Sequence, residues 1–375
     1  MRIAICTDIY LPQLSGVSDS LEILVQELIR RGHAVRLYAP ALPGAVLDPN
    51  IVRLRSFAVP GSGGGLALVL PFGAMSDIQG FAPDVIHTNT ASTAGIFAWY
   101  ASRTLRVPLV GTDHTFPADY LHYAKLNFPP FPYLVRKWSA WYYQRCDFVT
   151  APSQSMLDEL ARYNMTRPSQ VISNHIPTDA FRPLQNKDEL KKKYGIEKKV
   201  ILIFGRIALE KNLDRALEIV SGVMKKIDAE LVFIGDGPYR EMLVTHVKTL
   251  GLEGRTRFLG VLRGEVLTEA INACEVFLIT STSETQSMTT LQAMACELPV
   301  VAINAGGLPE YVQNNKNGYV VAGDDTKMFE ERLLELLTDA PRAQTLGAQG
   351  RRDVARFSPK RITEQFLALY QSEIN

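Results

Sequence analysis

The segment from Ser283 to Ala302, SETQSMTTLQAMACELPVVA, constrains the fold more than any other part of the chain. It follows the apolar run EVFLIT and has the pattern of a loop that opens with a carboxylate, then an apolar-faced helix, then a second short apolar strand. Strand, loop and helix in this order form an α/β unit, and such units bind ligands at the carboxyl ends of their strands. We therefore expect a ligand site at this edge of a parallel sheet.

A second loop of the same kind follows the apolar run VILIF, from Val200 to Phe204. It carries two cations, Arg206 and Lys211. Charge-assisted hydrogen bonds from such groups contribute about 1.5 to 3 kcal/mol each. Two cations and a carboxylate near strand ends predict a site for a diphosphate together with a hydroxylated group.

The length of the chain favours two domains, because 375 residues with 46% hydrophobic content can fill two ordinary cores. A formal net charge of +1 gives no overall reason to expect nucleic acid, whose binders carry a basic face. The cysteines lie far apart without C-x-x-C spacing, which favours buried thiols over a zinc site or a disulfide framework. They are Cys6, Cys146, Cys274 and Cys296.

Apolar runs in the sequence are short. The first, in MRIAICTDIY, is too short before Asp8 for a signal peptide, and no run reaches the roughly 18 residues of a membrane span. We therefore expect a cytoplasmic protein.

Strand and helix patterns recur in two similar halves, and the first half is typical of a doubly wound parallel sheet. We place the boundary near Arg182, which gives domains at 1–182 and 183–357. The last helix, 358–375, is expected to begin with Ser358 as N-cap and Pro359 in its first turn, and it could pack on either domain. The expected strands of the first half are RIAIC, AVRLYAP, IVRLRS, DVIHT, PLVGTDH and DFVTAP.

Several candidate residues of the second half have two interpretations. Glu284 could bind sugar hydroxyls, or it could cap the helix that follows. Gly306 and Gly307, before LPE, could let backbone N–H groups approach an anion, and so could the turn that contains Gly235 and Gly237 in FIGDGP. Turns need glycine in any case, so each cluster alone indicates little.

The first half has candidates of its own. Asp8 and Gly16 lie between the first strand and the first helix, in the loop that this architecture most often uses for ligands. His114 comes just after an apolar strand, where its side chain could face a ligand or could be structural. The glycine-rich segment Pro60 to Gly65 has the composition of a surface loop, with a phosphate cradle as the alternative.

The stretch from Tyr120 to Arg145 is unusual in composition. It has nine aromatic residues, four Lys or Arg and no Asp or Glu. Aromatic and basic groups together suit the interface of an anionic membrane, where each cation contributes about 1 kcal/mol. The alternative is an aromatic core helix that follows a proline-rich turn.

Together, GRIALEKN, FIGDGP, SETQSMTTLQAMA and AGGLPE, with TDIYLPQLSGV near the start and FRP between the halves, resemble the retaining glycosyltransferases of family 4. The resemblance implies a GT-B fold, with two Rossmann-like doubly wound domains that face across a cleft. The second domain would hold most of the nucleotide sugar and the first would hold the acceptor. It also implies transfer without an essential metal, so we expect no cofactor.

The resemblance also implies roles for residues. Arg206 and Lys211 would hold the donor diphosphate and stabilise the leaving nucleotide. Glu284, the first acid of the family's E-x7-E motif, would lie near the donor sugar, with Gly16 beside the phosphates and His114 beside the transferred sugar. No carboxylate stands out as a covalent nucleophile, and the resemblance implies a front-face route. The implied catalytic residues are His114, Glu284, Arg206 and Lys211, and the implied donor-binding residues are Gly16, Arg206, Lys211, Gly235, Gly237, Glu284, Thr285, Gln286 and Gln292.

Within the family, HTFPADYLHY is similar to a segment of glycosyltransferases that glucosylate diacylglycerol, and these relatives mostly use a UDP-sugar, often UDP-glucose. This implies a lipid acceptor, a UDP-sugar donor and peripheral association with the cytoplasmic face of a membrane. A soluble acceptor, or phosphatidylinositol as for related mannosyltransferases, remains open, and a same-fold epimerase is less favoured. The implied acceptor and membrane residues are Asp119, Tyr120, His122, Lys125, Arg136, Lys137 and Trp138.

Two positions depart from the family pattern. Gln292 stands where the second acid of E-x7-E belongs, and the lost charge is expected to cost about 1 to 2 kcal/mol of donor binding. This leaves a catalytically weakened nucleotide-sugar-binding protein as an alternative. In SNHIP, His175 replaces a usual glycine and predicts a different turn there.

Overall fold

The computed structural model describes residues 1–13, 15–45, 48–58, 67–124 and 126–374. The chain divides into two compact units, one formed by Met1–His175 with the segment from Pro359 onward, the other by Ile176–Ser358. The division thus falls before Ile176 and not near Arg182. The Ile176 N–H donates to Phe357 O at 2.9 Å, a contact within the second unit.

Among the described residues of the first unit, eight strands form one sheet in the order β4-β3-β2-β1-β5-β6-β7-β8. The six expected strands are all present. β4 and β8 were not expected, and β4 pairs antiparallel with β3, whereas the other neighbouring pairs are parallel. The strands are β1 (Arg2–Cys6), β2 (Ala34–Pro40), β3 (Ile51–Ala58), β4 (Ala67–Leu70), β5 (Val85–Thr88), β6 (Leu109–Thr112), β7 (Phe148–Ala151) and β8 (Ser169–Val171).

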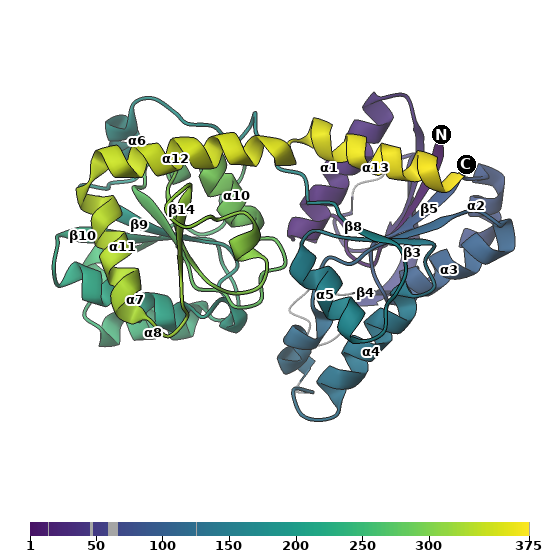
Figure 1. Cartoon of the computed structure of the whole chain (residues 1–375), viewed down its shortest axis with the longest axis horizontal. Coiled ribbons are helices and arrows are strands. Elements are labelled where there is room, and N and C mark those ends of the chain that lie inside the picture. The colour runs from purple at the N-terminus through teal and green to yellow at the C-terminus, as the bar shows by residue number, and fades with distance from the viewer. Residues whose placement is uncertain (14, 46–47, 59–66, 125, 375) are drawn as a thin grey trace. The chain divides into compact units, whose positions relative to one another are not determined.

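Helices cover both faces of this sheet (Figure 1). The first helix begins after Ser15, whose side chain accepts from the Ser18 N–H, and buries Leu21, Leu24 and Leu28 on one face. The helices are α1 (Gly16–Arg30), α2 (Ala74–Phe81), α3 (Thr93–Leu105), α4 (Phe131–Tyr143), α5 (Gln154–Arg162) and α13 (Pro359–Ile374), with a 3₁₀ segment η1 (Pro117–Ala124).

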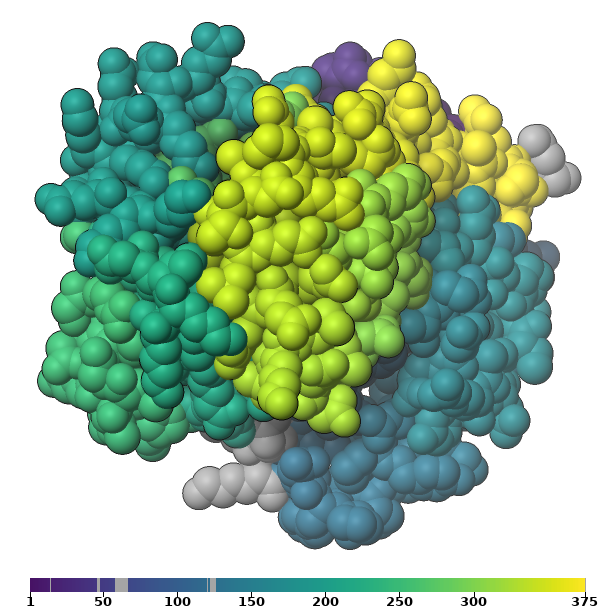
Figure 2. All heavy atoms as spheres, turned by 60° about the vertical axis from the view of Figure 1, so that its left-hand side comes forward, coloured from purple at the N-terminus to yellow at the C-terminus, as the bar shows by residue number. Residues whose placement is uncertain are grey.

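The described strands of the second unit form a wholly parallel sheet in the order β11-β10-β9-β12-β13-β14. In the space-filling view, α11 and α12, in yellow-green, form a continuous outer surface of this unit (Figure 2). The strands are β9 (Lys199–Phe204), β10 (Ala229–Ile234), β11 (Thr256–Phe258), β12 (Val276–Ile279), β13 (Val300–Ile303) and β14 (Gly318–Val321). The helices are α6 (Lys187–Lys193), α7 (Leu213–Met224), α8 (Arg240–Thr249), α9 (Gly264–Asn272), α10 (Met288–Ala295), α11 (Thr326–Thr338) and α12 (Ala340–Val354), with 3₁₀ turns η2 (Leu209–Lys211), η3 (Glu253–Arg255), η4 (Leu308–Glu310) and η5 (Ala355–Phe357).

The last helix, α13, belongs to the first unit and lies beside α1 (Figure 1). The expected apolar face, with Ile362, Phe366, Leu369 and Tyr370, is buried. Two polar contacts fix the helix further. Tyr370 shares a 2.7 Å hydrogen bond with His87 Nδ1, and His175 Nε2 lies 3.2 Å from Thr363 Oγ1.

His175 also explains the departure at SNHIP. Its Nδ1 lies 3.1 Å from Ser20 Oγ on α1, and its ring stacks on Phe366 with 6.2 Å between centroids. The imidazole therefore joins α1 to α13, which a glycine at this position could not do.

The four cysteines are free and buried, as the spacing predicted. Within the part of the chain that the structure describes, none of the helices has the length and apolar character needed to cross a bilayer.

Candidate active site

In the second unit, a cation and a carboxylate from two strand-end loops form an ion pair. Lys211 closes the η2 turn after β9, and Glu284 lies between β12 and α10. Lys211 Nζ is 2.7 Å from Glu284 Oε1, with 23% and 11% of the two side chains exposed. The structure thus brings together two of the predicted site residues. Arg206, in the same loop as Lys211, is half-buried.

The residue that follows β12 fixes the backbone of the loop after β9. Thr280 follows this strand, and its hydroxyl donates to Lys211 O at 3.2 Å and to Asn212 O at 3.0 Å. Asn212 has a positive φ of 53° and stands at the start of α7. This arrangement fixes where the backbone turns, and therefore where the ammonium group of Lys211 lies.

Two glycines in the strand-end loops of the second unit allow neighbouring backbone segments to approach each other closely. A Cβ on Gly235 would lie 1.9 Å from Gly205 O, and one on Gly237 would lie 2.3 Å from Ile207 O. The N–H of Gly235 donates to Gly260 O at 2.7 Å, and that of Gly237 to Asp236 Oδ1 at 2.8 Å. The two glycines therefore allow close backbone approach, and their part in anion binding stays a prediction.

The glycine pair after β13 acts on the Glu284 loop in the same way. Gly306 has a φ of 53°, and a Cβ there would lie 2.2 Å from Glu284 O. The Gly307 N–H donates to this carbonyl at 2.8 Å. The Gly307 N–H therefore holds the backbone of Glu284, and an approach of this loop to an anion stays a prediction.

Helix α10 has its own cap, so Glu284 is not needed for that purpose. Ser287 accepts from the Thr290 N–H at 3.3 Å, and the Ser287 N–H donates to Tyr311 Oη at 2.8 Å. Gln286 is buried, whereas Thr285 and, on α10 itself, Gln292 are half-buried. The capping interpretation of Glu284 is thus excluded.

At the corresponding edge of the first unit, His114 lies among the uncharged side chains of Asn89 and Asn174, and we call these three residues the neutral edge. His114 follows β6 and is 8% exposed, and its Nε2 lies 2.8 Å from Asn89 Oδ1, which follows β5. Burial lowers the pKa of His114 to about 4, against an opposing hydrogen bond from Asn174. The imidazole is therefore uncharged near pH 7 and is held by two amides.

The Asp8 side chain caps the start of helix α3. Its carboxylate accepts from the Ala94 N–H at 3.1 Å and from the hydroxyls of Thr90, Ser92 and Thr93, so it caps α3. Burial raises the pKa of this carboxyl group. Gly16, in contrast, stands at the first position of α1.

The aromatic and basic stretch forms α4, which buries one face and exposes the other. Trp138 is 45% and Trp141 40% exposed, and their rings stack at 4.9 Å. The Arg145 guanidinium lies 3.3 Å from the centroid of Trp141, and the ammonium of exposed Lys137 lies 5.1 Å from that of Tyr133. The helix thus has a core face that includes Tyr142 and Tyr143 and an outer aromatic and cationic face, and contact of the outer face with a membrane stays a prediction.

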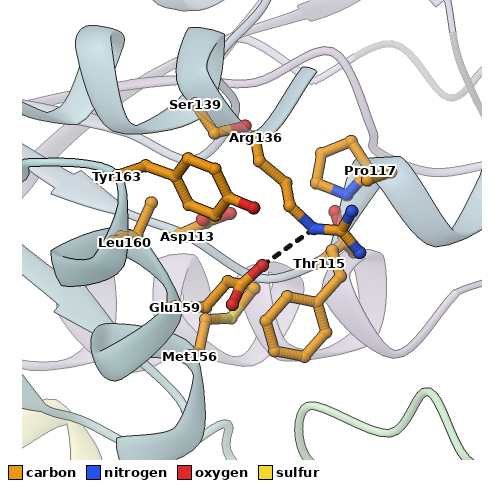
Figure 3. Close-up of a pocket in the computed structure, with 11 residues that line it drawn as sticks. Asp113, Thr115, Pro117, Arg136, Ser139, Met156, Glu159, Leu160 and Tyr163 are labelled. Carbon is orange, nitrogen blue, oxygen red and sulfur yellow. Dashed lines mark ion pairs between the residues drawn. The ribbon is translucent and has the colours of Figure 1, made fainter. Parts of the chain in front are cut away.

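Arg136 differs from the other cations of α4. It pairs with Asp119 of η1 and with Glu159 of α5, beside a cavity of about 20 Å³. Figure 3 shows its side chain directed toward the Glu159 carboxylate. The predictions for the side chains of Tyr120 and His122, for Lys125 and for the segment from Pro60 to Gly65 lie outside the described residues.

Sequence reasoning missed Asn89, Asn174, Glu159 and Thr280. Asn89 and Thr280 each follow a buried strand directly, the same signal that pointed to His114. Asn174 and Glu159 carry no such signal, because only the fold brings them to His114 and Arg136.

Two family models cover most of the chain. "Glycosyltransferase Family 4" matches residues 14–180 and "Glycosyl transferases group 1" matches residues 186–353. An alpha-monoglucosyldiacylglycerol synthase of Streptococcus pneumoniae is 30% identical over 91% of this chain and 79% of its own length. A GDP-mannose-dependent alpha-mannosyltransferase of Mycolicibacterium smegmatis is 27% identical over 99% of this chain and 97% of its own.

The fold is shared with solved structures. The Anabaena protein HepE in complex with UDP superposes with a TM-score of 0.80 at 20% identity, over 99% of this chain and 100% of that one. A sucrose-phosphate synthase from Thermosynechococcus elongatus superposes with a TM-score of 0.77 at 20% identity, over 99% and 98% of the two chains.

Proposed function

Because this chain belongs to glycosyltransferase family 4 and has the GT-B fold of two Rossmann-like domains, we propose that it transfers glucose from UDP-glucose to diacylglycerol with retention of configuration. The single observation that carries the donor half of this proposal is the Lys211–Glu284 pair at the strand ends of the second unit. The acceptor half rests on the outer face of α4 in the first unit.

The donor side combines a cation for phosphate with a carboxylate for hydroxyls. An ammonium group has three donors, so Lys211 can serve a phosphate oxygen as well as Glu284. Its charge, with that of Arg206, stabilises the nucleotide as it leaves. Glu284, held by Gly307 through its carbonyl, accepts from sugar hydroxyls. Protein groups supply the positive charge here, so the proposal needs no metal.

On the acceptor side, we assign Trp138, Trp141 and Lys137 to contact with an anionic membrane. Aromatic rings and cations on one exposed helix face suit the lipid interface. The similarity to an alpha-monoglucosyldiacylglycerol synthase supports a lipid hydroxyl as the acceptor. The protein would then act as a peripheral protein on the cytoplasmic face.

The transfer step needs no protein nucleophile in this proposal. The acceptor hydroxyl attacks on the side of the leaving phosphate, which accepts its proton, so the new bond forms on the face where the old one breaks. His114 is uncharged, because its pKa is about 4, and it contributes hydrogen bonding beside the transferred sugar.

A second candidate is transfer of mannose from GDP-mannose to another acceptor. It is favoured by the similarity to GDP-mannose-dependent alpha-mannosyltransferases over 99% of the chain. Gln292, in place of an acid, favours weakened donor binding in either case.

The experiment is nucleotide release from UDP- and GDP-sugars, with and without diacylglycerol in anionic vesicles. We expect lipid-dependent release from UDP-glucose and an α-linked glycolipid identified by mass and anomeric coupling. Release that depends only on a soluble acceptor, or only on GDP-mannose, would contradict the proposal, and Lys211→Gln serves as the inactive control.

A further inference from the structure

Two cations that are neighbours on α4 have different surroundings. Lys137 is exposed and lies over Tyr133. The Arg136 side chain is only 31% exposed, with Nε 2.8 Å from Glu159 Oε1 and Nη2 3.3 Å from Asp119 Oδ1. The charge of Arg136 is therefore committed to carboxylates of the protein itself.

These two pairs join three elements. Asp119 lies on η1, Arg136 on α4 and Glu159 on α5. A planar guanidinium can serve two carboxylates in fixed directions, which the point charge of a lysine cannot do equally well. Arg136 is thus built to hold η1 and α5 on the same helix.

The η1 segment depends on such a tie. Hydrogen bonds in a 3₁₀ helix have poorer geometry than in an α-helix. Of the first two residues of the segment, Ala118 is buried and Pro117 is exposed. The cavity of about 20 Å³ that Phe116, Pro117 and Ala118 line with Arg136 and Glu159 has room for about one water molecule. Close packing is therefore interrupted where η1 meets α4.

Other charged groups near Arg136 do not replace its partners. Asp113 lines the same cavity, and burial raises its pKa to about 7, so this carboxyl group is partly uncharged near neutral pH. Arg162 lies 3.3 Å from Glu159, but its side chain is 74% exposed, which weakens the pair.

We propose that Arg136 is a positioning residue that fixes η1 against α4 and thereby orders the acceptor-binding segment. The role of η1 in acceptor binding rests on the proposed function. The contacts that Arg136 makes with Asp119 and Glu159 do not depend on it. It assigns Arg136 a different role from that of Lys137, although the two are adjacent in sequence and both basic.

The test compares Arg136→Gln, Arg136→Lys and Asp119→Asn, with Arg162→Gln as the matched control, because Arg162 also pairs with Glu159 but is 74% exposed. With a short-chain diacylglycerol in detergent, we expect Arg136→Gln and Asp119→Asn each to raise the acceptor KM about tenfold, the loss of one charge-assisted contact, and to leave the donor KM within about twofold. The double variant should be no worse than either single one, because both remove the same tie. Arg136→Lys should give an intermediate acceptor KM, and Arg162→Gln should leave both KM values within about twofold, as expected for an exposed pair.

A second readout does not need an acceptor. Amide hydrogen exchange in peptides that span residues 115–124 should speed up in Arg136→Gln and Asp119→Asn, and stay unchanged in Arg162→Gln. If exchange speeds up in these two variants while even the unmodified protein glycosylates no lipid, Arg136 does hold η1 in place and the proposed function is wrong. If exchange and acceptor KM are unchanged in Arg136→Gln and only vesicle binding falls, Arg136 is a membrane contact and the proposal is overturned.

Discussion

The two units carry their candidate residues at the same topological position but differ in charge. At the strand ends of the second unit, Lys211 and Glu284 are ionised and paired at 2.7 Å. At those of the first unit, His114 is uncharged and is held by the amides of Asn89 and Asn174. Related sheets thus offer a charged edge, suited to a diphosphate, and a neutral edge, suited to hydroxyls.

Removing the cation of the charged edge should have the largest effect. Lys211→Gln deletes charge-assisted bonds to the donor and leaves the 11%-exposed Glu284 side chain without its partner. We expect kcat/KM to fall about 100-fold or more, from about 3 kcal/mol of lost interaction. Lys225→Gln, on the far end of α7, is the control. A loss under about fivefold would mean that this edge does not bind the diphosphate.

The neutral edge should respond more weakly. Asn89→Ala removes one neutral hydrogen bond to His114, worth about 1 kcal/mol, so kcat should fall about fivefold to tenfold. The pH profile should show no inflection near 6.5 from His114, because burial lowers its pKa to about 4. Steady-state rates from pH 5 to 8 check both, and a loss as large as that of Lys211→Gln would erase the contrast between the edges.

Replacing Gln292 by the glutamate of the family motif should strengthen donor binding at the charged edge. Gln292→Glu places a carboxylate on α10 and should lower the donor KM about fivefold to tenfold, from a gain of about 1 to 1.4 kcal/mol. Initial rates over a range of donor concentrations measure it. An unchanged donor KM would show that Gln292 lies away from the nucleotide.

Acid should weaken the first unit through its buried histidines. Burial lowers the folded-state pKa of His175 to about 3, below the usual value of 6.5, so the unfolded chain takes up the proton first. The stability that the neutral ring contributes is complete above pH 6.5 and is lost as the pH falls toward 3. The loss is about 1.4 kcal/mol per pH unit.

His175→Gln lacks this titration, so its deficit in unfolding free energy should shrink from pH 7.5 to pH 5. Urea unfolding at both pH values measures the deficit. A deficit that stays constant would show that His175 is not buried as an uncharged ring.

Chelation should have the smallest effect. Since Arg206 and Lys211 supply the positive charge in the proposed mechanism, EDTA should change the rate less than about twofold, within the range of weak salt effects. A larger loss that Mg²⁺ or Mn²⁺ restores would show that the charged edge is incomplete without a metal.

Local patterns predicted much of the fold, because apolar runs and strand-end polar residues are visible in short windows. Arg206, Lys211, Glu284 and His114 were found in this way. β4 was missed because it has only four residues, and its antiparallel pairing leaves no signal in a short window.

Contacts between distant segments could not be read from the sequence. The Lys211–Glu284 pair joins residues 73 positions apart. Likewise, nothing near Gly307 in sequence indicates that its N–H holds the Glu284 carbonyl, or that Arg136 faces Asp119 and Glu159 while Lys137 faces outward. Such contacts depend on which loops the sheet order brings together.

Amide hydrogen exchange with and without UDP-glucose tests the central claim most directly. The account predicts slower exchange in residues 205–212 and 281–290 of the second unit, and loss of this protection in Lys211→Gln. Protection that is absent from both loops, or that persists undiminished in Lys211→Gln, would contradict the assignment of the charged edge to the donor diphosphate.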